Sequence, residues 1–184
     1  DVCPATAREG LYSDGIRFLK NEVKKATSLE DSARVASLTD SIFLLYDQRM
    51  ELYPATKKRP NNRCFILGYK ASDFYNFNRD DPTTANAWFK ESIDCLKEQT
   101  SAAVLSQYYV TSFYAMKALE GDSAKEKLGE MLTEYLVLTD YIESNIANAV
   151  DAEDTKTATG FQKAKKNIDE VFIAIAQCED MVPV

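Results

Sequence analysis

The sequence contains no histidine in 184 residues. This absence excludes Ser-His-Asp and Cys-His catalysis, histidine-ligated metals and imidazole pH switches. The six glycines form neither a GxG nor a GxxxxGK pattern, so no phosphate-binding loop is visible. No apolar run approaches the roughly 18 residues that cross a bilayer, and we therefore expect no membrane span.

Cysteines are few, and Cys3, Cys64, Cys95 and Cys178 form neither a CxxC pair nor a zinc-binding spacing. They leave two interpretations open: buried thiols, or up to two disulfides with three complete pairings. If a bridge forms, we favour Cys3 with Cys64, because the N-terminal segment must be held against the apolar helix expected at residues 62–78. We expect neither a metal nor a cofactor.

The balance of charge makes a nucleic-acid partner unexpected. The formal net charge is -7 and the isoelectric point about 4.8, so the mean field repels phosphate backbones. Lys57, Lys58, Arg59 and Arg63 form a compact basic cluster around a proline-bounded turn. Such a cluster is typical of a solvated loop.

Acidic residues are plentiful, but no pair of them stands out as catalytic. Asp80 and Asp81 precede a predicted helix, where a carboxylate acts as a cap. Asp151, Glu153 and Asp154 lack the glycine and the regular ligand spacing of a calcium loop. Capping and solvated roles account for these groups, and we expect no enzymatic activity.

Apolar residues recur at steps of three and four along most of the chain, which predicts amphipathic helices. The predicted helices cover residues 6–26, 31–52, 62–78, 83–99, 101–119, 123–149 and 161–178. A polar, acidic loop is expected at residues 151–159, and no segment has the alternation of a strand. Helices with such short connections pack antiparallel to their neighbours, either as a closed bundle or as stacked hairpins.

Several helix ends carry recognisable capping signals. Asp81 and Pro82 predict an N-cap followed by the first helical position. Ser123 and Glu126 have the spacing of a capping box, and Gly121 suits the left-handed residue that ends the preceding helix.

Composition is typical of a globular protein, with 45% hydrophobic and 28% charged residues, and we expect one domain covering residues 1–184. The helix at 62–78 is apolar nearly all round, so neighbouring helices should cover it. Core packing explains the ten tyrosines and nine phenylalanines. If several of them are exposed together, an aromatic groove for peptide or sugar is the alternative.

Leu67-Gly68, followed by Ala85, Phe89 and Ile93, resembles the tetratricopeptide (TPR) pattern. In that pattern a large-small pair on one helix admits a small residue and an aromatic residue from the next. Short motifs follow one another along the chain: the Cys-Pro near the start, Gly10-Leu11-Tyr12-Ser13-Asp14-Gly15, Leu44-Leu45-Tyr46-Asp47-Gln48-Arg49, Phe65-Ile66-Leu67-Gly68-Tyr69-Lys70 and Ala164-Lys165-Lys166-Asn167-Ile168-Asp169. Their order resembles that in exported TPR-like proteins of Gram-negative anaerobic bacteria.

The resemblance implies an all-α fold in which about seven antiparallel helices stack as TPR-like hairpins, an αα superhelix. It also implies a non-enzymatic scaffold in the periplasm or elsewhere in the cell envelope, with a protein or peptide as its partner. The chain starts at Asp1 without a methionine, which agrees with removal of a leader during export.

In TPR proteins that bind peptides, the first helix of each hairpin lines the concave face. Carried onto this sequence, the resemblance gives seven candidate ligand-binding residues: Asn62, Phe65, Tyr69, Ser72, Asp73, Tyr108 and Thr111. The alternative interpretation is that Phe65 and Tyr69 belong to the core and their neighbours to a seam between helices.

Two other classes of function stay open. A carboxylate-based hydrolase or lyase on a helical scaffold requires two acidic groups that converge in one cleft. A purely structural bundle that only self-associates requires no groove.

Overall fold

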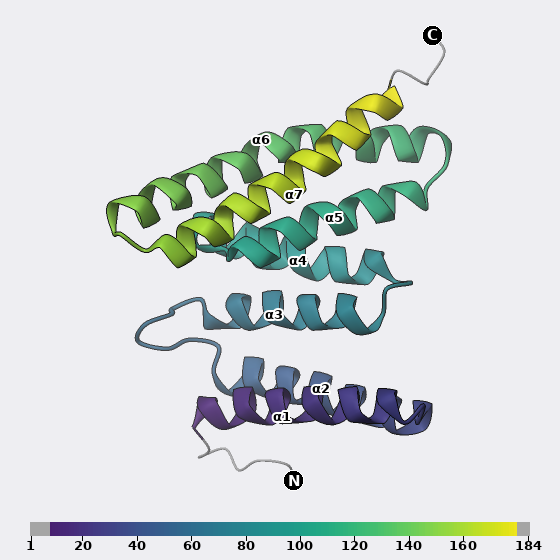
Figure 1. The fold of residues 1–184 in the computed structure, drawn as a ribbon, viewed down its shortest axis with the longest axis vertical. Helices are drawn as coiled ribbons and strands as arrows, with labels where there is room; N and C mark the ends of the chain where they lie inside the picture. The colour runs from purple at the N-terminus through teal and green to yellow at the C-terminus, as the bar shows by residue number, and fades with distance from the viewer. Residues whose placement is uncertain (1–7, 180–184) are drawn as a thin grey trace. The chain divides into compact units, whose positions relative to one another are not determined.

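The computed structural model describes residues 8–179, with side chains as far as Ala176. This part of the chain is all-helical, as the apolar periodicity predicts, and contains no strand (Figure 1). Its elements are α1 (Glu9–Ser28), α2 (Ser32–Leu52), α3 (Asn62–Phe77), α4 (Pro82–Leu96), the 3₁₀ helix η1 (Lys97–Gln99), α5 (Ala102–Lys117), α6 (Gly121–Asp151) and α7 (Thr155–Glu179).

The chain divides into two compact units, Asp1–Lys70 and Ala71–Val184, and the boundary falls within α3. That residues 1–184 form one domain stays a prediction.

In the first unit, α1 and α2 form a helical hairpin. Asp31 is the N-cap of α2, where its carboxylate accepts a 3.0 Å hydrogen bond from the backbone N–H of Arg34. The helices bury apolar stripes that recur at helical spacing: Tyr12, Ile16, Val23 and Ala26 on α1, and Ile42, Leu45, Tyr46 and Met50 on α2. Burial of these stripes drives the two helices together.

A partly buried carboxylate also holds the first unit together. Glu9 Oε1 accepts hydrogen bonds from Arg49 Nε at 3.1 Å, from Arg49 Nη2 at 2.8 Å and from Asn62 Nδ2 at 2.9 Å. Asn62 Nδ2 also donates to the carbonyl of Tyr53 at 2.9 Å. Burial alone would raise the pKa of Glu9, but the bonds from Asn62 and Arg49 outweigh it and hold that pKa below its ordinary value.

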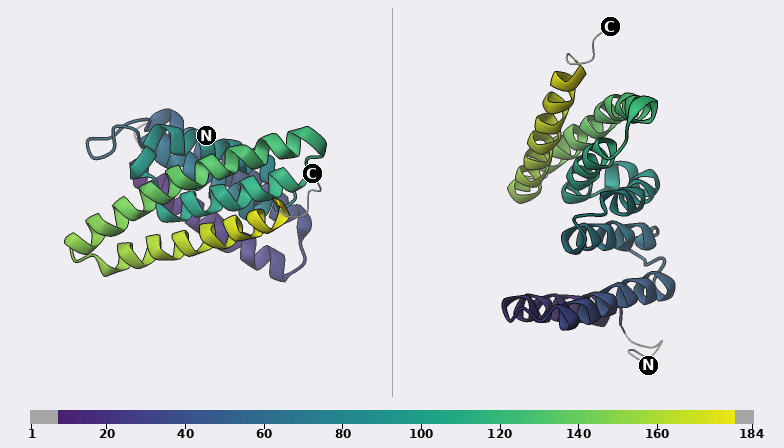
Figure 2. Two further views of the ribbon diagram at one scale, coloured as in Figure 1. Left: turned by 90° about the horizontal axis from the view of Figure 1, so that it is seen from above. Right: turned by 90° about the vertical axis from the view of Figure 1, so that its right-hand side faces the viewer.

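In the second unit, α5 packs against α4, α6 and α7, and α6 also packs against α7 (Figure 2). The sequence of α5 carries no charged residue before Lys117, so several of its faces can be covered without burying a charge. Its fully buried residues include Leu105 and Tyr109. They join a core formed with Phe89 of α4 and with apolar stripes from α6 and α7: Met131, Leu138, Ile142, Phe161, Ala164, Ile168 and Ile175.

Capping predictions at α4 are confirmed. Asp81 is the N-cap and accepts a 3.0 Å hydrogen bond from the backbone N–H of Thr84, and Pro82 is the first helical residue. Gly121 has a φ of +61°, the left-handed conformation expected of it. It nevertheless stands at the first position of α6, so the predicted capping box at Ser123 and Glu126 is wrong.

The loop predicted at residues 151–159 is also wrong, because α7 begins at Thr155. The Asp154 carboxylate accepts hydrogen bonds from the Thr157 backbone N–H at 3.0 Å and from the Thr157 hydroxyl at 2.6 Å, which caps the helix. Leu119, the last residue of the helix predicted at 101–119, lies beyond the end of α5 and is 42% exposed. The predicted first turn at Thr6 lies outside the described residues.

Cys64 and Cys95 are both disulfide-bonded, so the interpretation as buried thiols is wrong for these two residues. Cys3 and the side chain of Cys178 lie outside the described part of the chain, and the pairing of Cys3 with Cys64 stays a prediction. Between residues 8 and 179, no helix has the combination of length and hydrophobicity that crossing a membrane demands.

Candidate functional site

Three of the seven candidate ligand-binding residues lie in the first unit. Asn62 is 1% exposed, and its amide is engaged by Glu9 and Tyr53. Phe65 is half-buried, with the guanidinium carbon of Arg59 4.8 Å from its ring centroid. Tyr69 is 40% exposed and is the most accessible of the three.

The other four candidates lie in the second unit. Ser72 is half-buried, and its hydroxyl donates a 2.6 Å hydrogen bond to Gln107 Oε1 on α5. Asp73 is buried. Tyr108 and Thr111 of α5 both contact Asn86 of α4. The Nδ2 of Asn86 donates to the Tyr108 carbonyl and to the Thr111 hydroxyl, both at 3.1 Å.

Thr111 has no exposed surface, so its observed role is to fasten α5 to α4. The Asn86 amide also donates to Ser112 Oγ at 2.7 Å, and this buried polar cluster fixes how the two helices pack. Tyr108 differs from Thr111, because its hydroxyl reaches a cavity between α4 and α6.

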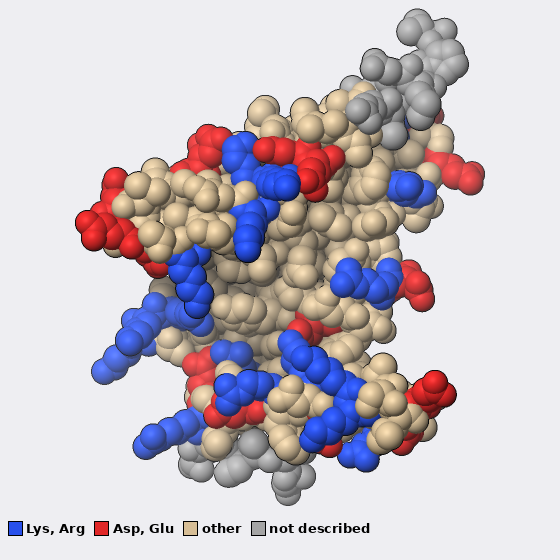
Figure 3. Space-filling model, in the orientation of Figure 1, with Lys and Arg blue, Asp and Glu red and all other residues tan. Residues whose placement is uncertain are grey.

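Two adjoining hollows, of about 370 and 320 Å³, lie between α5 and α7 and share Asn167. We call them together the α5–α7 groove. Its lining residues are Ala102, Ala103, Ser106, Gln107, Val110, Phe113, Tyr114, Gly160, Lys163, Ala164, Asn167, Glu170, Val171 and Ala174. The surface over α5 is largely uncharged, in contrast to the lysines and acidic residues along α7 (Figure 3).

Polar side chains run across the floor of this groove. Gln107 receives the hydrogen bond from Ser72, and Asn167 Nδ2 donates a 3.1 Å hydrogen bond to Ser106 Oγ. Within the described residues, the Gln107 amide nitrogen and the Asn167 carbonyl oxygen have no hydrogen-bond partner. The groove therefore offers one donor group and one acceptor group to an incoming chain.

A second cavity, of about 260 Å³, lies between α4 and α6 above Tyr108. We call it the α4–α6 cavity. Its lining residues are Lys90, Ile93, Asp94, Lys97, Tyr108, Thr133, Glu134, Val137, Leu138 and Tyr141.

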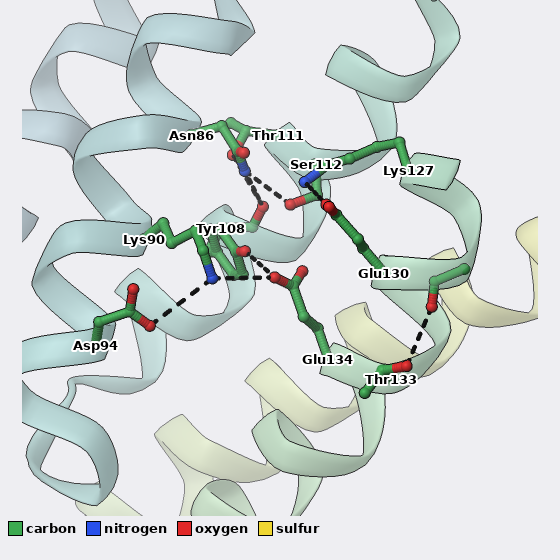
Figure 4. A network of polar contacts seen from close by, with 11 residues as sticks. Asn86, Lys90, Asp94, Tyr108, Thr111, Ser112, Lys127, Glu130, Thr133 and Glu134 are labelled. Carbon is green, nitrogen blue, oxygen red and sulfur yellow. Dashed lines mark hydrogen bonds and ion pairs between the residues drawn. The ribbon is translucent and has the colours of Figure 1, made fainter. Parts of the chain in front are cut away.

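A charged cluster occupies one side of the α4–α6 cavity (Figure 4). Glu134 Oε1 accepts a 2.5 Å hydrogen bond from the Tyr108 hydroxyl, and Lys90 Nζ lies 3.4 Å from the same oxygen. Lys90 Nζ also lies 3.8 Å from Asp94 Oδ1. Burial and the bond to Glu134 raise the pKa of Tyr108 far above its ordinary value, so the phenol stays a donor.

Asp94 and Glu134 are thus two carboxylates on one cavity, the arrangement that a carboxylate-based hydrolase or lyase requires. Both contact Lys90, and the enzymatic alternative stays a hypothesis. Among the described residues, no three histidine, cysteine or acidic side chains are grouped as metal ligands would be.

Sequence reasoning missed Asn86, Gln107, Glu134 and Asn167. Asn86 directly follows Ala85, which is buried, and Glu134 directly precedes Tyr135, which packs against the core. A polar residue at the edge of an apolar stripe is the signal that could have found them, because it must be paired when its helix is covered.

Comparison of the chain with protein-family models, with curated proteins and with solved structures finds no match.

Proposed function

We propose that this protein is a non-enzymatic scaffold that binds an extended peptide segment of a partner protein in the α5–α7 groove. The observation that carries the proposal is that the α5 side of the groove is uncharged and that two amide groups of the lining, those of Gln107 and Asn167, retain hydrogen-bonding capacity. An extended peptide presents free backbone N–H and C=O groups, and side-chain amides can satisfy both kinds.

The order of the helices supports the same function. α5 is the first helix of a hairpin and α6 is the second. α7 follows α6 in the chain and packs directly against α5. In TPR proteins the peptide-binding face is formed by the first helix of each hairpin. The resemblance of the sequence to TPR-like proteins therefore favours the α5–α7 groove as the peptide-binding surface.

The lining of the groove indicates which peptide it would accept. Ala103 and Gly160 leave room near one end, whereas Phe113 and Tyr114 provide aromatic surface near the other. Glu170 lies seven positions after Lys163 on α7, a helical rise of about 10 Å that matches about three residues of extended chain. We expect a mostly uncharged peptide with small side chains toward Ala103 and a larger apolar one toward Tyr114.

Selection of random displayed peptides on the immobilised protein tests this proposal. Ala103→Arg places a long charged side chain in the groove, at an exposed position that folding tolerates. Ala147→Arg is the matched control, because Ala147 is exposed on α6 and does not line the groove. Selected peptides should lose affinity at least about tenfold for Ala103→Arg and keep it for Ala147→Arg.

Failure to select any peptide, or equal binding by both arginine variants, would refute the groove as a peptide site. Tyr69 and Asp73, the candidates proposed from the sequence, give a second comparison. If substitution of Tyr69 abolishes binding while Ala103→Arg does not, the ligand contacts α3 in place of the groove.

We also propose that the protein acts in the cell envelope after export. The disulfide bonds of Cys64 and Cys95 support this location, because disulfides persist in oxidising compartments and are rare in the cytosol. Labelling with a maleimide after rapid denaturation tests the proposal on protein from its native cell. Unlabelled Cys64 and Cys95 are expected, and stoichiometric labelling of both would contradict it.

A further inference from the structure

The α4–α6 cavity is a second concave site, built from residues that the peptide proposal does not use. α4 and η1 contribute Lys90, Ile93, Asp94 and Lys97, and α6 contributes the wall that carries Glu134. None of these residues lines the α5–α7 groove. The cavity and the groove are therefore built from different residues.

Only one of the two carboxylate oxygens of Glu134 accepts hydrogen bonds from the described residues. Both of its donors, the Tyr108 hydroxyl and the Lys90 ammonium, contact Oε1. Oε2 is buried and has no hydrogen-bond partner within the described residues. A carboxylate can accept about four hydrogen bonds, and a buried acceptor left unpaired is costly, so Oε2 is suited to a donor from outside the chain.

The net charge of Lys90, Asp94 and Glu134 indicates which kind of hydrogen-bond donor Glu134 Oε2 would accept. Lys90 lies between the carboxylates of Asp94 and Glu134, so two negative groups share one positive group. This cluster carries an excess of one negative charge and favours a cation over a neutral donor. Lys97, the other cationic residue that lines the cavity, is exposed and opposes the binding of a cation.

The single unoccupied oxygen of Glu134 favours an ammonium group over a guanidinium group. A guanidinium binds best to both oxygens of a carboxylate at once, but Oε1 of Glu134 is already occupied by Tyr108 and Lys90. A compact ammonium needs only the single free oxygen. Ile93, Val137 and Leu138 form an apolar wall along the rest of the cavity, where a hydrocarbon stem can be buried.

We propose that the α4–α6 cavity binds a primary alkylammonium group, with the ammonium donating to Glu134 Oε2 and the stem lying against Ile93, Val137 and Leu138. A lysine side chain of a partner protein and a free aliphatic diamine share this chemistry. The volume of about 260 Å³ gives room for either stem.

Titration calorimetry with defined probes tests the proposal. The probes are Nα-acetyl-lysine methylamide and 1,5-diaminopentane, and Nα-acetyl-norleucine methylamide is the uncharged control. Both amines should show saturable binding, and the norleucine compound should bind at least about tenfold more weakly because it lacks the charge-assisted hydrogen bond. Tighter binding of the lysine compound assigns the site to a protein lysine, and tighter binding of the diamine assigns it to a free amine.

Two substitutions connect the binding to the cavity. Glu134→Gln removes the charge with little change in shape and should weaken both amines at least about tenfold. Glu130→Gln is its matched control, because Glu130 stands one turn earlier on α6, pairs with Lys127 at 2.9 Å and does not line the cavity. The control should bind like the wild type.

Lys97→Gln provides a test that leaves Lys90, Asp94 and Glu134 unchanged. It removes a positive charge from an exposed residue that lines the cavity and should tighten amine binding about twofold or more. The proposal is overturned if neither amine binds saturably, if Glu134→Gln and Glu130→Gln bind alike, or if Lys97→Gln weakens binding.

Discussion

Truncation of Glu9 tests whether one carboxylate organises the first unit. In Glu9→Ala, the guanidinium of Arg49 and the amide of Asn62 lose their shared acceptor. The side chain of Arg49 is 10% exposed and Asn62 is 1% exposed, so water reaches these donors poorly. The Arg49 guanidinium and the Asn62 amide stay in the protein after the substitution. When an ion pair is broken, most of the loss in stability comes from the buried charge that is left unpaired.

The structure bounds the size of this effect. Breaking a fully buried pair from one side costs about 3–5 kcal/mol. The Glu9 side chain is 26% exposed, so solvent already weakens the pair and can partly replace it. We therefore expect Glu9→Ala to lower the free energy of unfolding by about 2–3 kcal/mol.

Urea denaturation followed by circular dichroism measures this loss, and hydrogen exchange locates it in α1 and α2. Glu22→Ala is the control on the same helix: Glu22 pairs with Lys25 at 2.6 Å and with Arg34 at 3.2 Å, and these partners, unlike Arg49, have side chains that are 70% and 55% exposed. It should change stability much less, because surface ion pairs contribute little. Equal effects of the two substitutions would refute the argument from burial.

The dependence of stability on pH gives an independent check on the same carboxylate. The pKa of Glu9 is lowered in the folded state, so its contribution is fully present above the ordinary value of 4.5 and is lost as pH falls through the folded-state pKa. The stability difference between wild type and Glu9→Gln should therefore shrink below about pH 4.5. A difference that grows on acidification would contradict the sign of this linkage.

Two further predictions concern the second unit, and both are measured by urea denaturation. Asn86→Ala removes the amide that bridges α4 to α5 and leaves the buried Tyr108 carbonyl without that donor; we expect a loss of about 2 kcal/mol, and a loss under 0.5 kcal/mol would contradict it. Gly129→Ala should stabilise α6 by about 0.5–1 kcal/mol, because an added Cβ meets nothing within 4 Å, whereas Gly121→Ala should cost about 1 kcal/mol because of its positive φ. Changes of the same sign at the two glycines would refute this reasoning.

Apolar periodicity predicted the helices of the second unit well. Met131, Leu138 and Ile142 on α6, and Phe161 and Ile168 on α7, follow the three- and four-residue steps that predicted these helices, and all five are buried. These positions are determined by the helical repeat alone, since the residues that face a neighbour must be apolar whichever neighbour it is.

Helix ends were less predictable, because polar residues occur both in loops and in exposed helical turns and do not distinguish the two. The segment from Asp151 to Thr159 was expected to be a loop, yet only three residues separate α6 from α7. Asp154 caps α7 through Thr157, and the first apolar contact of the helix comes only at Ala158. The first turn of α7 carries no buried apolar residue, so apolar periodicity could not indicate where this helix begins.

The candidate sites required the spatial arrangement of several helices. The TPR resemblance gave candidates on α3 and α5. Among them, Ser72 donates to the groove residue Gln107, and Tyr108 lines the α4–α6 cavity. The resemblance could not identify Glu134 or Asn167, because their significance depends on which helix each one faces. Pairing between distant helices is not encoded in the local spacing of either helix.

Successive residues of α5 serve different sites, and Tyr108→Phe separates them. A helix turns about 100° per residue, so Gln107 lines the groove whereas Tyr108 reaches the cavity. Loss of the phenol removes the 2.5 Å hydrogen bond to Glu134 and should cost about 1–2 kcal/mol of stability. Peptide affinity in the groove should stay unchanged, and the amines should still bind, because Glu134 keeps its charge and its free oxygen. A parallel fall in peptide affinity would mean that α5 itself had moved, so the two surfaces could not be treated as separate sites.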